Sequence, residues 1–331
     1  MYITWGLEYV GGDACRHPHT HLYTQNMAAT KNIVVFGGTG QQGSAFIRAL
    51  GAYNASAPQY SIYLLSRDPS AGSSKRLESV PGVKVVQVAK NYTDEPVAAF
   101  TATGLKKGEV HGAFSMQGYI SAEAQLHQGI AIADAAKDYG VKHIIYCSFD
   151  LPDHPVSWTE AEAKRKIENH IKESGMGYTI LGDTDFMDNW LPTNKYMFKF
   201  SRTMVLYHSY SDPKQKHQMI STRDIGRAGA KAIHEPEKYL NKKLRLAGDE
   251  QTPADIERIY KEVMGKPIET TYSFVALLMK KTIPMLGQMA EYFDQNDHPI
   301  PLEETRAILP DVENLREFLE RYKAEQAAKG K

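Results

Sequence analysis

Residues 31–50 read KNIVVFGGTGQQGSAFIRAL and decide the fold of the chain. Residues 33–36 form an unbroken apolar run, which is typical of a strand covered on both faces of a parallel sheet. Gly37, Gly40 and Gly43 follow at three-residue spacing, and then apolar residues recur with a helical period. Glycines let a backbone approach a dinucleotide pyrophosphate, and a helix N-terminus offers it unpaired N–H groups. An ordinary turn with incidental glycines is the alternative, but three spaced glycines favour a binding turn.

Length and composition restrict the class of protein. The chain has 331 residues, of which 42% are hydrophobic and 24% charged, as in a globular α/β protein. Lys and Arg total 39, as do Asp and Glu, so the zero net charge favours neither nucleic acid nor an anionic membrane as partner. Cys15 and Cys147 imply no disulfide framework, which fits the cytoplasm. No apolar run approaches the roughly 18 residues that a membrane span needs.

The first 26 residues differ from the rest of the chain. They show no sustained apolar period, and we expect them to be poorly ordered. Cys15 stands with His17, His19 and His21 in this segment, and such side chains bind metals. Their spacing matches no zinc finger, and alternate histidines occur equally in solvated tails, so we predict no metal site.

Residues 60–65 (YSIYLL) predict the second strand, and Arg67 and Asp68 follow it. The position just after this strand reads the adenosine ribose: an arginine pairs with a 2′-phosphate and selects NADP, whereas an acid accepts from a free 2′-hydroxyl and selects NAD. Arg67, with Lys75 and Arg76 close behind, favours NADP because the charges match. Asp68 would favour NAD if the register moved by one residue, and Arg67 could also be a solvated loop residue.

Strands and helices alternate along most of the chain. Apolar runs predict further strands at 83–88, 110–116, 141–148, 178–181, 217–220 and 243–247, and helices at 95–101, 122–139 and 224–234. This alternation predicts an α/β fold with a Rossmann-type, doubly wound parallel sheet. The end of the fourth strand, Ser115, Met116 and Gln117, should then approach the cofactor at the carboxyl edge of the sheet.

We expect a smaller, mostly helical C-terminal lobe beside this sheet. Thr252 before Pro253 predicts a helix start, and Gly265 predicts its end. We assign residues 27–182 and 217–250 to the dinucleotide-binding domain and residues 183–216 and 251–331 to a lobe for a substrate or partner.

One lysine is predicted on the inward face of a helix. Thr159, with Glu162 three residues later, predicts a capping box, and Ile167 and Ile171 mark the apolar stripe. Lys164 lies on that stripe, so its ammonium group needs a destination. One destination is the cofactor ribose or the substrate at the sheet edge. The other is water, with the stem buried and the charge exposed.

With these residues in place, the chain resembles the NmrA-like family of atypical short-chain dehydrogenases, close to isoflavone-reductase-like enzymes. The resemblance covers residues 31–268 and, more weakly, the tail. It is carried by GGTGQQG at 37–43, HQGIAIADAAKDYGVKHIIYCS at 127–148, AKRKIENHIKESGMGYTIL at 163–181, FMDNW at 186–190 and STRDIGRAGAKAIHEPEKYLNKKLRLAGDEQTPADI at 221–256.

The resemblance implies a Rossmann domain that binds NADP(H) and a smaller lobe over a cleft. Arg67 would take the 2′-phosphate, and Lys164 is the family's helix lysine, the candidate catalytic residue. The implied pyrophosphate loop is Gly37, Gly38, Thr39, Gly40, Gln41 and Gln42, with Gly43 behind it. The residues implied at the nicotinamide end are Ser115, Met116, Gln117, Phe186, Met187, Asp188 and Asn189.

The chain departs from the family's pattern at three places. Short-chain dehydrogenases carry a tyrosine four residues before the lysine, where this chain has Glu160. That tyrosine donates the proton to a carbonyl, and an ionised Glu160 would donate poorly and could pair with Lys164. Residues 89–90 are Ala-Lys where relatives carry an acid near the adenine, and residues 181–183 are Leu-Gly-Asp in place of the more usual Arg-Pro.

Two functions fit these features. The first is an NADP(H)-dependent oxidoreductase that acts on a small organic substrate, in secondary-metabolite biosynthesis by analogy with fungal relatives. The second is a non-catalytic NADP(H)-binding redox sensor that regulates a protein partner such as a transcription factor, and the missing tyrosine favours it. A sensor could also work in the nucleus. We expect a monomer or a homodimer that contacts neither nucleic acid nor membrane directly.

Overall fold

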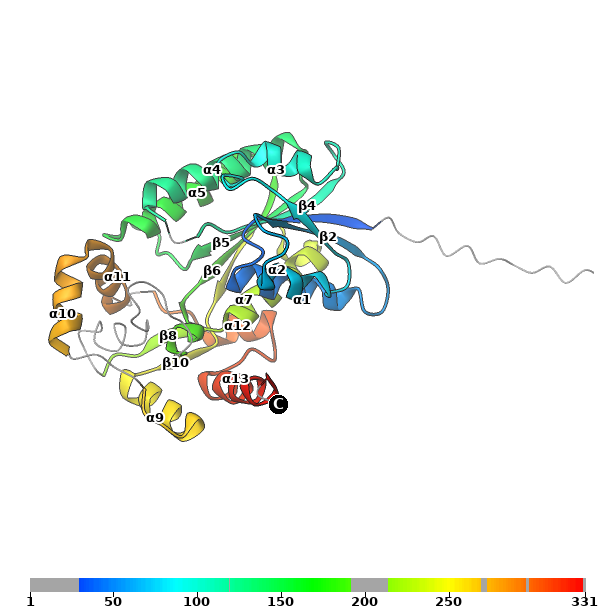
Figure 1. Cartoon of the computed structure of the whole chain (residues 1–331). Helices are drawn as coiled ribbons and strands as arrows, with labels where there is room; N and C mark the ends of the chain where they lie inside the picture. The colour runs from blue at the N-terminus through cyan, green and yellow to red at the C-terminus, as the bar shows by residue number, and fades with distance from the viewer. Residues whose placement is uncertain (1–29, 119, 192–213, 269–272, 296–297, 330–331) are drawn as a thin grey trace, which may run out of the picture.

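A seven-stranded parallel sheet forms the centre of the molecule in the computed structural model, which describes residues 30–118, 120–191, 214–268, 273–295 and 298–329 (Figure 1). The strand order is β3-β2-β1-β4-β5-β6-β9, and every neighbouring pair is parallel. The order reverses between β1 and β4, so the sheet is doubly wound as predicted. The strands are β1 (Lys31–Val35), β2 (Tyr60–Ser66), β3 (Val83–Gln87), β4 (Val110–Ser115), β5 (His143–Phe149), β6 (Gly177–Asp183) and β9 (Lys242–Leu246).

Helices cover both faces of this sheet (Figure 1). Residues 33–36 alternate between two cores: Ile33 and Val35 belong to one apolar cluster, and Val34 and Phe36 belong to the other. Burial on both faces therefore explains the unbroken apolar run. One face carries α1 (Gln41–Tyr53), α2 (Gly72–Glu78) and α7 (Thr222–His234), and the other carries α3 (Pro96–Ala102), α4 (Ala122–Asp138) and α5 (Thr159–Glu173).

A second, three-stranded sheet packs with the C-terminal helices. Its strands are β7 (Asp185–Phe186), β8 (His217–Ile220) and β10 (Asp249–Gln251); β8 pairs antiparallel with β10 and parallel with β7. The short helices η1 (Met187–Trp190) and α8 (Pro236–Tyr239) follow β7 and α7. The remaining helices are α9 (Pro253–Met264), α10 (Ser273–Thr282), α11 (Pro284–Gln295), α12 (Leu302–Ile308) and α13 (Leu315–Lys329).

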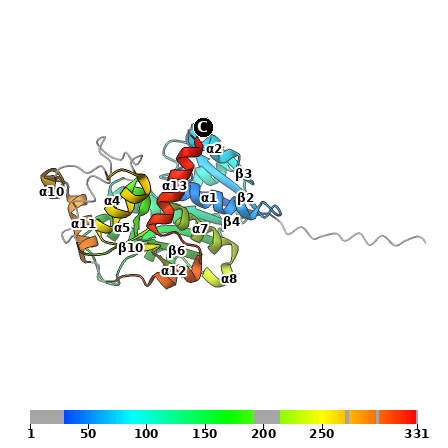
Figure 2. The same cartoon turned by 90° about the horizontal axis from the view of Figure 1, so that it is seen from below.

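The C-terminal segment packs on the α7 side of the sheet, as the two views of the cartoon agree (Figures 1 and 2). Lys231 of α7 donates to the carbonyl of Ile308 at 2.9 Å. Leu309 is buried in the same apolar cluster as α1 and α7. Residues that lie far apart in the sequence therefore hold α7 in place.

Local signals at helix ends were partly right. Thr252 caps α9 by accepting from the amide of Asp255, and Gly265 ends that helix in the left-handed conformation, as predicted. The capping box at Thr159 was wrong, because Trp158 is the N-cap and Thr159 already lies in α5. Glu162 instead accepts from the amide of Val156, so its carboxylate holds the preceding loop.

Other predictions missed an element, fall outside the described residues or stay untested. The strand predicted at 243–247 is followed by β10, whose three residues are too few to show an alternating pattern. Residues 1–26 and their His and Cys cluster lie outside the described residues. The division of the chain into a dinucleotide-binding domain and a lobe at the stated boundaries stays a prediction. None of the helices in the described residues is long and apolar enough to cross a membrane.

Gly43, the third of the spaced glycines, lets the first turn of α1 pack directly against the turn after β1. A Cβ atom on Gly43 would lie 2.4 Å from the carbonyl oxygen of Gly37 and 2.8 Å from the Cα of Gly38. Both atoms belong to the backbone, so the contact cannot be relieved by a side-chain movement.

We therefore expect Gly43→Ala to lower the free energy of unfolding by about 2 kcal/mol in urea denaturation. Gly72→Ala is the matched control, because a Cβ there meets only the mobile end of Arg76 at 3.4 Å. Alanine is a better helix former than glycine, so the control should be as stable as the wild type or slightly more stable. Equal stability of the two variants would contradict the proposed close packing.

Candidate functional site

The glycine turn after β1 presents the open N-terminus of α1. Gly37 has a φ of 73°, a left-handed conformation that suits glycine, and its carbonyl accepts from the amide of Gly40 at 3.0 Å. Gly40 is the N-cap of α1, and no side chain caps the helix. The first N–H groups of α1 are therefore free to bind an anion, which is what a pyrophosphate requires.

Two further residues lie against this turn. Met116, which directly follows β4, places its Cε 3.3 Å from where a Cβ on Gly40 would be. Tyr92 accepts from the amide of Gly37 through its hydroxyl at 3.3 Å, and its ring stacks on Phe36 with centroids 6.0 Å apart. Met116 was predicted at the site, whereas Tyr92 was not. The only signal for Tyr92 was its place in the loop after the third strand.

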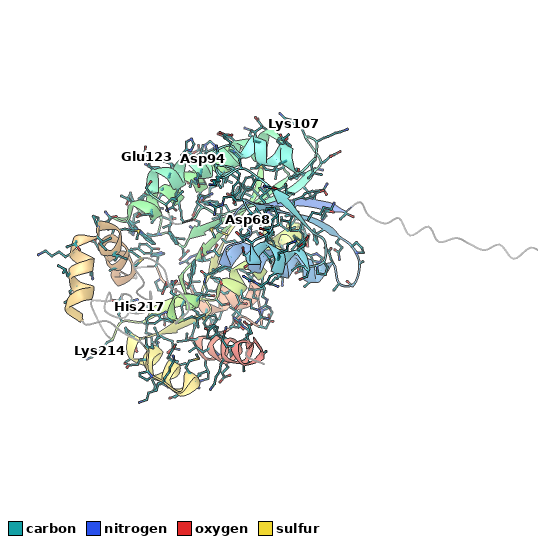
Figure 3. All side chains as sticks on the ribbon, in the orientation of Figure 1. Asp68, Asp94, Lys107, Glu123, Lys214 and His217 are labelled. Carbon is teal, nitrogen blue, oxygen red and sulfur yellow. The ribbon has the colours of Figure 1, made fainter. Side chains whose placement is uncertain are left out.

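Arg67 and Asp68, which follow β2, differ in whether their charged groups have partners within the described residues. Arg67 is exposed and forms no hydrogen bond or ion pair with any residue that the structure describes. Asp68, labelled in Figure 3, accepts from the amide and hydroxyl of Ser70 at 2.9 and 2.6 Å. These hydrogen bonds hold the pKa of the Asp68 carboxyl below its usual value. The arginine is thus available to an external anion, and the carboxylate is engaged in its own turn.

The end of β4 presents a buried amide oxygen. Gln117 donates through Nε2 to the hydroxyl of Ser115 at 3.1 Å, and both side chains are buried. The Oε1 atom of Gln117 is buried without a hydrogen-bond partner among the described residues. A buried polar atom of this kind is costly in a folded protein unless a ligand or water satisfies it.

Lys164 is buried along its whole side chain, including the ammonium group. Its side chain is 7% exposed, and Nζ donates to the carbonyl of Cys147 at 3.0 Å. The ammonium lies 5.0 Å from the ring centroid of Phe149 and 5.5 Å from that of Tyr146. Burial lowers the pKa of Lys164, and the carboxylates of Asp183 and Glu168 oppose that shift. The ammonium therefore does not reach into water by snorkelling.

Asp183 brings a carboxyl group to the same edge of the sheet. It ends β6, it is buried, and its Oδ2 accepts from Nε2 of Gln42 at 2.9 Å. Neither Oδ1 of Asp183 nor Oε1 of Gln42 has a partner among the described residues. Burial raises the pKa of Asp183 to about 8, although Lys164, Lys243 and Gln42 act to lower it. At the level of the sequence, Asp183 stands out only as a departure from the family's usual Arg-Pro. The signal that could have identified it is an acid at the end of an apolar strand.

A second buried carboxylate is fully paired. Glu168 of α5 accepts from the hydroxyl of Ser148 at 2.5 Å and from Nζ of Lys243 at 3.1 Å. Lys172 adds an ion pair at 3.5 Å. These contacts fix α5 to β5 and β9. The carboxylate of Glu168 is therefore occupied by structural contacts and is not available to a ligand.

Residues 186–189 connect β7 with the lobe. Met187 is fully buried in the core of the lobe. Asp188 accepts from the amide and the hydroxyl of Thr222 at 2.8 Å each, at the start of α7. Asn189 donates to Asp185 at 2.7 Å, and Phe186 is half-buried. Contacts with a cofactor at these four positions stay a prediction.

Glu160 has a different partner from the one expected at the sequence level. It is half-buried and accepts from the hydroxyl of Thr159 at 3.2 Å. Within the part of the chain that the structure describes, Lys164 forms no ion pair with it. The carboxylates that interact electrostatically with this lysine are instead Asp183 of β6 and Glu168 of α5.

Comparisons with known proteins agree on the family and the fold. A model of the NmrA-like family matches residues 29–319. An NmrA-like family domain-containing protein of Dictyostelium discoideum is 23% identical over 267 residues, which covers 74% of this chain and 81% of that protein. The NADPH-dependent quinone oxidoreductase QOR2 of Escherichia coli, solved with NADPH, matches at a TM-score of 0.67 and 22% identity over 88% of this chain and 99% of its own. The negative transcriptional regulator NmrA, solved with NADP, matches at a TM-score of 0.65 and 17% identity over 91% and 98%.

The raised pKa of Asp183 predicts a pH-dependent cost to the fold. Because the folded pKa of about 8 exceeds the ordinary value of 3.8, the folded protein holds a proton that the unfolded chain has lost between these pH values. The free energy of unfolding therefore falls as the pH rises through this window. Asp183→Asn should lack this component, so that from about pH 5 to about pH 8.5 it gains about 4 kcal/mol relative to the wild type.

Urea denaturation of the ligand-free protein at both pH values measures this difference. Asp138→Asn is the control, because that carboxylate is exposed at the end of α4. Its pH profile should follow that of the wild type. A profile of Asp183→Asn parallel to the wild type would mean that Asp183 is ionised in the folded protein at about pH 5.

Proposed function

Because the chain belongs to the NmrA-like family, we propose that it is an NADP(H)-dependent oxidoreductase acting on a small organic substrate. By analogy with fungal relatives, the substrate class proposed is an aromatic or polyketide-like carbonyl compound or enone from secondary metabolism. The observation that carries the proposal is the buried ammonium of Lys164. It interacts electrostatically with Asp183, whose carboxyl group accepts from Gln42 in the open first turn of α1. A charge held in the interior at the carboxyl edge of the sheet costs stability, and such costs concentrate at functional sites.

The residues present fit a dinucleotide phosphorylated on its 2′-hydroxyl. The uncapped amides of α1 would hold the pyrophosphate, and the unpaired guanidinium of Arg67 would hold the 2′-phosphate. Asp68 is bonded to Ser70, so it is not available to a free ribose hydroxyl. Gln117 would bond the other end of the cofactor through its unpaired oxygen.

Reduced nicotinamide supplies a hydride, and the chain must then supply a proton and hold the substrate. Lys164 is the residue proposed for that role, either as proton donor or by orienting ribose and substrate. Burial lowers the pKa of its ammonium, so the group gives up a proton more readily than an exposed lysine. Its hydrogen bond to Cys147 fixes where the ammonium lies.

A redox sensor is the second candidate, and the observation that favours it is Glu160. A glutamate stands where short-chain dehydrogenases carry the tyrosine that donates a proton, and among the described residues it forms no ion pair with Lys164. NmrA, which shares the fold, is named as a transcriptional regulator and binds NADP. A sensor would bind its protein partner with an affinity that depends on whether NADP⁺ or NADPH is bound. It would turn over no substrate.

Cofactor choice is tested by Arg67→Glu. Reversing the charge should weaken NADPH binding by about a hundredfold and NADH binding by less than about threefold, because only NADPH carries the 2′-phosphate. Titration calorimetry with both nucleotides measures this. Arg48→Glu, on an exposed position of α1 two turns from the glycine turn, is the control and should change neither affinity. Equal losses of both nucleotides in Arg67→Glu would place the ribose at Asp68.

Catalysis is tested by screening carbonyl compounds and enones for NADPH oxidation with Lys164→Met. Methionine keeps an apolar stem and removes the charge, so kcat should fall by about a hundredfold or more. Lys166→Met, exposed on the same helix, is the control and should retain full activity. Unchanged turnover in Lys164→Met would remove the proposed role of Lys164. NADPH binding without turnover of any compound would instead favour the sensor.

A further inference from the structure

Asp183 holds a carboxyl group beside the helix to which phosphates would bind. Its partner Gln42 is the second residue of α1, and the hydrogen bond between them is 2.9 Å long. The other carboxyl oxygen, Oδ1, is buried with no partner among the described residues. One oxygen of the Asp183 carboxyl group therefore makes no hydrogen bond within the described residues. Glu168 differs, because Ser148 and Lys243 donate to its carboxylate.

The order of the strands decides which end of a dinucleotide Asp183 faces. In a doubly wound sheet the two halves of a dinucleotide lie on opposite sides of the point where the strand order reverses. That point lies between β1 and β4, and Arg67 marks the adenosine side at the end of β2. Asp183 ends β6 on the other side. The nicotinamide half is therefore the part that meets Asp183 and Lys164.

We propose that Asp183 determines the relative affinity of the site for oxidised and reduced nicotinamide, through the charge of its carboxyl group. This inference rests on the proposed binding of NADP(H). The phosphates are the same in NADP⁺ and NADPH, and only the nicotinamide ring changes its charge. An ionised Asp183 attracts the cationic ring of NADP⁺, whereas a protonated Asp183 does not distinguish the two rings by charge.

Several groups face Asp183 from the elements around it, and they decide its charge. Burial raises the pKa of Asp183 to about 8, and both Lys164 and Lys243 oppose that shift. The residues that interact with it are Lys164 on α5, Lys243 on β9, Gln42 on α1, and Tyr146 and Cys147 on β5. Asp183 becomes ionised as the pH rises through this value. The ratio of the Kd for NADP⁺ to the Kd for NADPH should therefore fall with rising pH.

The experiment measures both Kd values by titration calorimetry at about pH 6.5 and about pH 9, on either side of the pKa of about 8. In the wild type the ratio should fall by about tenfold between these pH values. In Asp183→Asn it should stay constant. Asparagine can still accept from Gln42, so the contact with α1 is retained. Asp138→Asn is the control, because α4 ends at the opposite edge of the sheet, and it should behave as the wild type does.

Lys164 provides the competing explanation, because loss of its proton would also favour NADP⁺. A pH-dependent ratio that persists in Asp183→Asn would assign the effect to another group and overturn the proposal. A constant ratio in the wild type would overturn it as well. If Asp183→Asn does not fold, calorimetry of the wild type in two buffers of different ionisation enthalpy counts protons. More protons should leave on binding NADP⁺ than on binding NADPH at about pH 8, and equal numbers would contradict the proposal.

The same data separate this inference from the function on which it rests. If neither nucleotide binds, both the oxidoreductase and the role of Asp183 are excluded. If both nucleotides bind with a ratio that does not respond to pH, only the role of Asp183 is excluded.

Discussion

The packing of the first turn of α1 against the turn after β1 is the constraint on which the rest of the molecule depends. Gly43 has no room for a Cβ atom beside the backbone of Gly37, so the first turn of α1 packs directly against the turn that follows β1. This contact leaves the first amides of α1 uncapped at the carboxyl edge of the sheet. It also places Gln42 where it can bond Asp183. The geometry of the candidate cofactor site and of its buried carboxyl group therefore has one origin.

Charges buried at the carboxyl edge differ in how far they are compensated. Glu168 receives a hydroxyl and two ammonium groups, and Lys164 has a backbone carbonyl and two aromatic rings around it. Asp183 has one amide and one oxygen without a partner. Desolvation without compensation shifts a carboxyl group toward its neutral form. The least compensated group is therefore the one whose charge a bound ligand can change most easily.

The fold does not decide between catalysis and regulation, since one fold carries many functions. The decision lies in individual side chains at the edge of the sheet. Glu160 removes the expected proton donor, and Lys164 remains with its ammonium buried. Asp183 adds a buried carboxyl group where the family more usually has Arg-Pro. This chain therefore combines a candidate cofactor site with ionisable groups that differ from the family's usual pattern.

The sequence alone determined the features whose cause lies within a few neighbouring residues. The apolar run of β1, the spaced glycines of residues 37–43 and the Thr252 cap of α9 were all predictable, because burial on two faces, close backbone approach and capping leave local patterns. The tertiary structure decided the rest. Gln42 meets Asp183 across 141 positions of the chain, and Lys164 meets the carbonyl of Cys147. Such contacts depend on the order and register of strands in the sheet, which no local pattern specifies.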